Sequence, residues 1–336
     1  MEESVKKARR VGRLSMILGA AFATSIAGAA CSEDETSAGQ KPTIGPVAND
    51  PGIEMPVDAT PSPDGKEIYF IANSKVADED DIGFSRQAAI YKVSAAGGPI
   101  TKLHQGEPLV APFGITISND GQTLFIADSG AVTSEERSDG RVYTLGASGG
   151  APSPLGGTDG LAPGGLEVMG DSLYITGRKD GRAGVFKTAL TGGAVTPVAV
   201  GEAFTDPSGV AVSRGGDVYV VDSGSATHGQ PLASVVKVKA DGSTEVVVSG
   251  LSVGHPAGIA LTHDEKTIYV SGFDSTKGTD VVFAVNSATR EIGEFTDSIA
   301  DFTESAGLHR ARNLDVFAWA DSHANGTGTV YVLRGQ

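Results

Sequence analysis

Cysteine is almost absent from this chain of 336 residues, in which Cys31 is the single cysteine. An intramolecular disulfide is therefore impossible, and packing must hold the fold together. Aromatic residues make up only 6% of the chain, and no long stretch after the first thirty residues has the apolar periodicity of a helix. Glycine is abundant instead, with 46 residues. This composition is typical of many short strands joined by tight turns.

Basic residues are also few. Lys and Arg together number 26 against 41 Asp and Glu, which gives a net charge of −15. A surface this acidic repels phosphate backbones, so we expect no nucleic-acid partner. Cationic ligands and divalent metals are compatible with this charge.

The N-terminal thirty residues have the parts of a signal peptide. Basic residues precede an apolar run that begins at Leu14 and ends in small residues before Cys31. We expect residues 1–30 to be a signal peptide, residues 31–41 to form a polar tether, and residues 42–336 to form one domain.

The position of Cys31 after "IAGAA" resembles the lipid-modified cysteine of bacterial lipoproteins, with Gly28 where that motif usually has Leu. The resemblance implies a lipid on Cys31 and a place in the cell envelope, in the periplasm or at the outer membrane. The membrane would then be contacted only through this N-terminal anchor. An ordinary secretory signal cut near Ala30 is the alternative.

One strand–turn–strand phrase recurs along the chain, as in "PFGITISNDGQTLFIADSG" at 112–130 and "PSGVAVSRGGDVYVVDSG" at 207–224. Each copy continues with a third strand, a turn that is often Gly-rich, and a fourth strand. Six copies at a period of roughly 50 residues predict an all-β, six-bladed β-propeller with four antiparallel strands in each blade. The sixth copy ends after its third strand, so we expect residues 42–47 to supply the fourth strand and close the ring. The aromatic residues at the strand centres are Tyr69, Phe125, Tyr174, Tyr219, Tyr269 and Phe317.

The repeated phrase resembles NHL repeats and the related SMP-30/gluconolactonase-like and strictosidine-synthase-like six-bladed proteins, over roughly residues 52–336. The SMP-30-like resemblance implies a metal ligand at Glu54, two residues before Pro56. The positions that correspond to a second ligand of that group, an Asn, hold Phe113, Ser208 and Ala257. A metal-dependent hydrolase of the lactonase type is therefore the alternative, and a binding protein is preferred.

The loops between the second and third strands are long, whereas the turns between the first and second strands are tight. We therefore expect a protein or small-molecule ligand to bind on the face that carries the long loops, the long-loop face. Asp128 and Asp222 begin two of these loops, and such carboxylates suit Ca²⁺ or another divalent cation. Asp side chains that cap turns explain the same pattern, and recurrence in several blades favours that explanation. The sequence identifies no cofactor with certainty, and it does not decide whether the protein is an enzyme.

One position of the innermost strands interrupts the repeat. It is held by Thr60, Thr116, Glu167, Ala211, Ala260 and His309. Glu167 and His309 are charged or titratable among small residues, and Arg310 follows where most blades have an aliphatic residue. A buried charge must be paired or shift its pKa. We expect Glu167, His309 and Arg310, with His255 as a further candidate, to form the polar floor of a ligand site beneath the long-loop face; a water-filled channel is the alternative.

Overall fold

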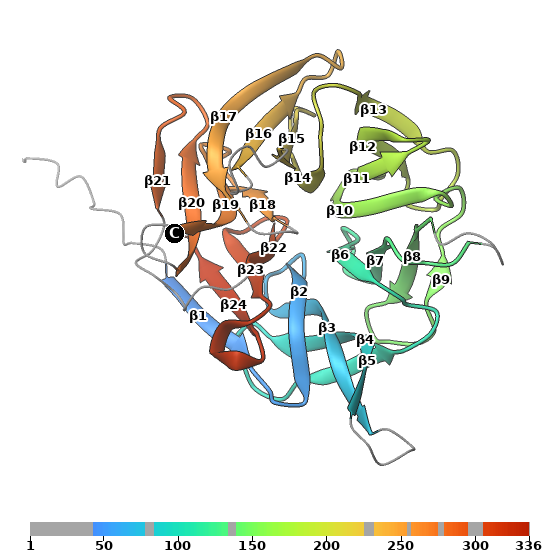
Figure 1. Ribbon diagram of the computed structural model, residues 1–336. Helices are drawn as coiled ribbons and strands as arrows, with labels where there is room; N and C mark the ends of the chain where they lie inside the picture. The colour runs from blue at the N-terminus through green and yellow to red at the C-terminus, as the bar shows by residue number, and fades with distance from the viewer. Residues whose placement is uncertain are drawn as a thin grey trace, which may run out of the picture. The chain divides into compact units, whose positions relative to one another are not determined.

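The computed structural model describes residues 43–77, 84–133, 139–224, 232–253, 257–274, 279–294 and 305–335. These residues form six antiparallel sheets of four strands each, arranged as the blades of a ring (Figure 1). The predicted six-bladed β-propeller is confirmed. Within the described ranges, a single 3₁₀ turn, η1 (Ala324–Gly326), is the one helical element, and no helix there has the length and hydropathy to span a membrane.

The first three blades follow one another along the chain, and each runs outward from its innermost strand. Blade one contains β2 (Ile53–Pro61), β3 (Glu67–Ala77), β4 (Phe84–Ser94) and β5 (Thr101–Gln105). Blade two contains β6 (Pro112–Ile117), β7 (Thr123–Asp128), β8 (Arg141–Gly146) and β9 (Ser153–Pro154). Blade three contains β10 (Leu161–Met169), β11 (Ser172–Lys179), β12 (Arg182–Ala189) and β13 (Thr196–Val200).

The remaining blades repeat this order until the last strand. Blade four contains β14 (Pro207–Val212), β15 (Val218–Ser223), β16 (Leu232–Val238) and β17 (Thr244–Ser252). Blade five contains β18 (Ile259–Leu261), β19 (Thr267–Asp274), β20 (Thr279–Asn286) and β21 (Ile292–Glu294). Blade six contains β22 (Ser305–Arg310), β23 (Val316–Asp321), β24 (Thr329–Arg334) and, as its outer strand, β1 (Thr43–Ala48).

The N-terminal strand closes the ring as expected. β1 pairs antiparallel with β24, from Thr43 opposite Arg334 to Ala48 opposite Val330. Pro46 is tolerated there because β1 lies at the outer edge of its sheet, where one side of the strand needs no backbone donor. The two ends of the described chain are thus held in one blade, which removes an open break between blades one and six.

The apolar core is divided among the spaces between blades. Alternate residues of each strand face one or the other neighbouring blade, so every blade contributes to two clusters. Ile115 and Ile126 of blade two pack with Tyr69 and Ile71 of blade one, for example. Trp319 of blade six is fully buried and stacks on Tyr331, with ring centroids 5.0 Å apart. Packing between blades therefore replaces a single central core.

The tight turns after the innermost strands are stiffened by side chains. Ser118 Oγ lies 2.5 Å from Asp120 Oδ1 and accepts hydrogen bonds from the N–H groups of Gln122 and Thr123. Gly121 has φ 71°, a conformation that favours glycine in such a turn. These turns form one face of the ring, the short-turn face, opposite the long loops. Side chains on the turns are consequently held in defined positions.

Candidate functional site

The innermost strands approach one another most closely at a column of glycines. These are Gly114, Gly165, Gly209, Gly258 and Gly307, one in each of blades two to six. A Cβ at Gly258 would overlap with the backbone of Leu308, and one at Gly307 would overlap with the carboxylate of Asp58. A cavity lined by four of these glycines and by Asp58 measures only about 10 Å³. The centre of the ring is therefore nearly closed there.

Asp58 occupies the glycine position in blade one, and its carboxylate fills the space beside Gly307. Its side chain is 3% exposed. One oxygen accepts a hydrogen bond from Ala59 N–H, and the other accepts one from Ile115 N–H in blade two, both at 2.8 Å. Asp58 thereby links the first two blades at the axis.

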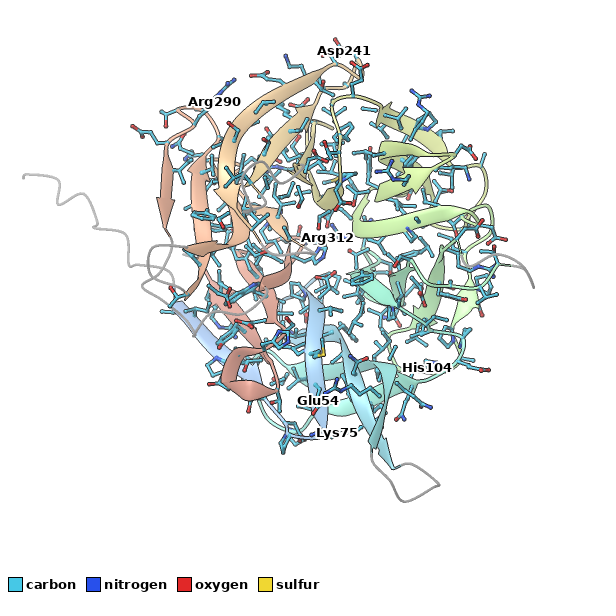
Figure 2. The ribbon with its side chains drawn as sticks, in the orientation of Figure 1. Glu54, Lys75, His104, Asp241, Arg290 and Arg312 are labelled. Carbon is cyan, nitrogen blue, oxygen red and sulfur yellow. The ribbon has the colours of Figure 1, made fainter. Side chains whose placement is uncertain are left out.

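Four charged side chains form a chain across the axis. His309 Nε2 lies 3.1 Å from Asp58 Oδ2, and His309 Nδ1 lies 3.7 Å from Glu167 Oε2. Arg312 Nη1 lies 2.5 Å from Glu167 Oε1. Arg312 Nη2 also donates to the carbonyl of Ile117 at 3.1 Å, and Arg312 lies near the ring centre (Figure 2). Residues of blades one, two, three and six are joined by this axial chain of Asp58, His309, Glu167 and Arg312.

The protonation state of the axial chain follows from its neighbours. Burial by itself lowers the pKa of His309, but the carboxylates of Asp58 and Glu167 outweigh it and raise that pKa to about 10. Burial raises the pKa of Glu167, but Arg312 and His309 outweigh it and bring that pKa below its usual value. His309 is thus a buried imidazolium at neutral pH, which makes it an ion-pair partner and not a general base.

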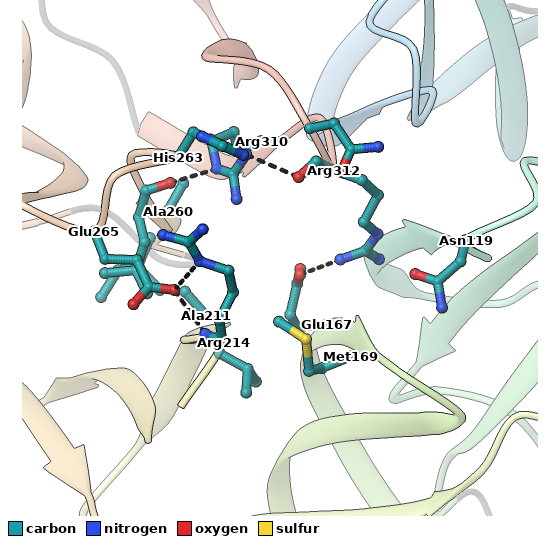
Figure 3. A pocket seen from close by; sticks show the side chains of 14 residues that line it. Asn119, Glu167, Met169, Ala211, Arg214, Ala260, His263, Glu265, Arg310 and Arg312 are labelled. Atoms are coloured by element: carbon teal, nitrogen blue, oxygen red, sulfur yellow. Dashed lines mark hydrogen bonds and ion pairs between the residues drawn. The ribbon is translucent and has the colours of Figure 1, made fainter. Parts of the chain in front are cut away.

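A cavity of about 350 Å³, here called the axial pocket, lies at the short-turn end of the innermost strands. Glu167 and Arg310 line it, together with turn residues from blades two, four, five and six (Figure 3). Its polar lining also includes Asn119, Arg214, His263, Glu265, Arg312 and Asn313. Its apolar lining consists of Met169, Ala211, Val212, Ile259, Ala260 and Leu261.

Three of the expected site residues therefore lie together, but near the short-turn end of the innermost strands. Glu167 and His309 come together across the axis from blades three and six. Glu167 and Arg310 line a pocket among the short turns, whereas we expected a floor beneath the long-loop face. The reason is the strand direction: the innermost strands end at the short-turn face, and Arg310 is the last residue of β22. His255 lies outside the described residues.

The aspartates that begin two long loops are engaged by the backbone. Asp128 accepts hydrogen bonds from the N–H groups of Val110 and Ala111, at 2.7 and 2.9 Å. Asp222 accepts them from Thr205 and Asp206, at 3.0 and 2.9 Å. Each aspartate thus holds the segment that leads into the innermost strand of its own blade. Burial raises the pKa of both carboxyl groups.

Glu54, the metal ligand implied by resemblance, is held in two ion pairs. Its Oε1 lies 2.7 Å from Lys75 Nζ and its Oε2 lies 2.6 Å from Arg86 Nε. Hydrogen bonds from Lys75 and Arg86 lower the pKa of Glu54. Figure 2 shows Glu54 beside Lys75 in blade one, away from Arg312. Within the described part of the chain, no three His, Cys, Asp or Glu side chains are grouped to hold a metal ion.

Asp58 and Arg312, two members of the axial chain, were not predicted from the sequence. Asp58 stands where the other blades have glycine, a difference visible in the aligned phrases. Arg312 belongs to a turn position at which blades four, five and six have Arg214, His263 and Arg312. Both signals lie in the same repeated phrase as the position that identified Glu167 and His309.

The comparisons with known proteins agree with this architecture. The NHL repeat family matches residues 204–227, in blade four. No curated protein matches the chain in sequence. In structure the chain is similar to a protein of unknown function from Dyadobacter fermentans, with a TM-score of 0.60 and 11% identity over 88% of this chain and 99% of that one.

Two further solved structures have the same general fold. A glucose dehydrogenase-like propeller from Thermus thermophilus has a TM-score of 0.57 and 11% identity over 87% of this chain and 99% of that one. TolB from Acinetobacter baumannii has a TM-score of 0.52 and 12% identity over 71% of this chain, and the match covers 53% of TolB. At such identities the likeness concerns the fold alone. The chain is a six-bladed β-propeller that contains an NHL repeat.

Proposed function

We propose that this chain is an exported binding protein whose ligand occupies the axial pocket. The observation that supports the proposal most is that Glu167 and Arg310, two charged residues that interrupt the repeat, line the same cavity. Building a blade does not require them, and burying charge costs free energy unless it is compensated. The cavity also combines charged groups with an apolar part of its wall, and small-molecule sites use both to bind and orient a ligand.

Two tryptophan substitutions test which end of the innermost strands holds the ligand. Met169→Trp would place an indole ring in the axial pocket, and Ser129→Trp would place one in the cavity on the long-loop face that Ser129 lines. A library of small organic compounds is screened for ligands that raise the melting temperature, as native-state ligands must. We expect Met169→Trp to abolish these shifts and Ser129→Trp to leave them. The reverse pattern would contradict the proposal and place the ligand on the long-loop face.

The hydrolase alternative has less support from the geometry. It depends on Glu54, whose two carboxylate oxygens are both occupied by cationic side chains. A divalent cation at Glu54 would have to displace Lys75 and Arg86 from it. The binding function is therefore the better account of the described residues.

Export and anchoring form the second part of the proposal, and they depend on sequence because Cys31 lies outside the described residues. A lipid on Cys31 would hold the propeller at the cell envelope through the tether of residues 31–41. We expect Cys31→Ser to release the protein into the soluble fraction or to leave it unprocessed. Unchanged partition into membranes would contradict the anchor.

A further inference from the structure

The axial pocket has an unusual share of the basic residues of an acidic chain. It is lined by Arg214, Arg310 and Arg312, with His263 beside them, and by the two carboxylates of Glu167 and Glu265. The chain as a whole has 26 basic against 41 acidic residues. Three arginines against two glutamates leave the lining with a net positive charge, and a net positive pocket favours an anionic ligand because it raises the local concentration of the opposite charge.

The three guanidinium groups are not equally neutralised. Arg312 pairs with Glu167, and Arg214 Nε lies 3.3 Å from Glu265 Oε1. Arg310 forms no ion pair with any described residue. Its hydrogen bonds go to backbone carbonyls instead: Nε donates to Leu261 at 2.5 Å, and Nη1 lies 2.7, 3.1 and 3.3 Å from the carbonyls of Ala311, Arg312 and Leu314. Its Nη2 donates to none of the described residues.

Carbonyl groups orient the Arg310 guanidinium without cancelling its charge. Burial lowers the pKa of Arg310, as expected for a cation that is partly removed from water. Figure 3 shows this guanidinium at the edge of the axial pocket. A planar guanidinium that is fixed, partly buried and not ion-paired with a described carboxylate is well suited to a carboxylate ligand, to which its Nη2 can donate a charge-assisted hydrogen bond.

The apolar part of the wall limits the ligand further. Met169, Val212, Ile259 and Leu261 present apolar surface to the same cavity. At about 350 Å³ the cavity is near the lower end of the range for small-molecule sites. An inorganic anion would leave this apolar wall in contact with water, whereas an apolar body attached to the anion would cover it.

We propose that the axial pocket binds a small organic monocarboxylate, with the carboxylate on Arg310 and the apolar body against Val212 and Leu261. This inference depends on the proposed binding function and names the ligand class for that site. Arg214 contributes a second positive charge at the rim, where its side chain is 65% exposed.

The experiment uses isothermal titration calorimetry on the full mature chain with four probes: hexanoate, the neutral hexanamide, the cationic hexylammonium and inorganic phosphate. We expect hexanoate to bind about tenfold more tightly than hexanamide, as one charge-assisted hydrogen bond would produce. Hexylammonium and phosphate should bind more weakly still. Arg310→Met should weaken hexanoate binding by about tenfold.

Arg178→Met is the matched control. Arg178 also donates to backbone carbonyls, those of Gly181 and Thr205, but it lines the cavities at the long-loop face. Its replacement should leave hexanoate binding unchanged. Because Arg310→Met also removes structural hydrogen bonds, the exposed Arg214→Met is a second variant, for which we expect a smaller loss of hexanoate affinity. The probe series on the unaltered protein does not depend on either variant.

Separate results would overturn the ligand class and the binding function. If hexanamide or hexylammonium binds as tightly as hexanoate and Met169→Trp abolishes the binding, the monocarboxylate is wrong and the axial site stands. Phosphate that competes equally with hexanoate would also overturn the organic monocarboxylate. If hexanoate binds and neither Arg310→Met nor Arg214→Met weakens it, the assignment of its carboxylate is wrong. Hexanoate binding that is unchanged in Met169→Trp would overturn the proposed function as well.

Discussion

At the long-loop end of the innermost strands, Asp128 and Asp222 accept hydrogen bonds from the backbone that enters their own blades. At the short-turn end, Arg310 donates to backbone carbonyls but has no carboxylate partner among the described residues. The aspartates therefore complete a turn, whereas the arginine keeps a positive charge available at a cavity.

The two ends also differ in how their charged residues are distributed along the repeat. Aspartate recurs at the end of the second strand in several blades, which is expected of a residue that helps to build each blade. Asp58, Glu167, His309 and Arg310 each interrupt the repeat, and they lie at the axis or in the axial pocket. In a repeat fold, the residues that depart from the pattern are the better indicators of a site.

The largest expected effect concerns the axial chain. Asp58→Ala removes the partner of His309 and an acceptor for two backbone N–H groups, so we expect a loss of about 3–5 kcal/mol in the free energy of unfolding. Urea denaturation measures it. Asp159→Ala, which breaks an ion pair whose aspartate side chain is 60% exposed, should cost less than about 1 kcal/mol. Equal losses in the two variants would show that the axial chain does not stabilise the ring.

A smaller loss is expected at the neighbouring glycine. Gly307→Ala places a Cβ against the Asp58 carboxylate, and overpacking of this kind costs about 1–3 kcal/mol. Gly45→Ala in β1 is the control, since no atom lies within 4 Å of its added Cβ. Both are compared by urea denaturation. A Gly307→Ala protein as stable as Gly45→Ala would mean that the space between Gly307 and Asp58 can accept a methyl group.

The axial chain should also depend on pH. The pKa of His309 is raised to about 10 in the folded protein from 6.5, so its stabilising contribution is full below pH 6.5 and is lost as the pH rises towards 10. We expect the stability difference between the unaltered protein and His309→Gln to shrink over this range. Denaturation curves at pH 6, 8 and 10 measure the difference. A difference that grows with pH would contradict the buried imidazolium.

The smallest expected effect is at the long-loop end. Since backbone N–H groups already occupy the carboxylate oxygens of Asp128 and Asp222, adding Ca²⁺ or EDTA should change the melting temperature by less than about 1 °C. Differential scanning calorimetry gives the comparison. If Ca²⁺ raises the melting temperature and this rise disappears in Asp128→Asn, the long-loop end has a cation site. The aspartates would then not be limited to completing turns.

The positions of the charged residues explain which parts of the site sequence could predict. Glu167 and His309 were recognisable because strand alternation gives their position the same direction in every blade. Asp58, two residues earlier in β2, has the same direction by alternation, and its departure from glycine is visible in the aligned phrases. Arg312 lies in a turn, where no alternation assigns a direction. Sequence alone also could not show that Arg310 faces the short turns, because this depends on where β22 ends.

The blade period, the antiparallel strands and the closing strand β1 follow from the sequence, since they depend on local patterns that repeat along the chain. The contact between His309 and Glu167 does not, because these residues are far apart in the chain and no local pattern relates them. Only the closed ring brings blades three and six to opposite sides of one axis. Burial there then compels the charges to pair, and Arg310, which has no ion-pair partner among the described residues, faces the pocket.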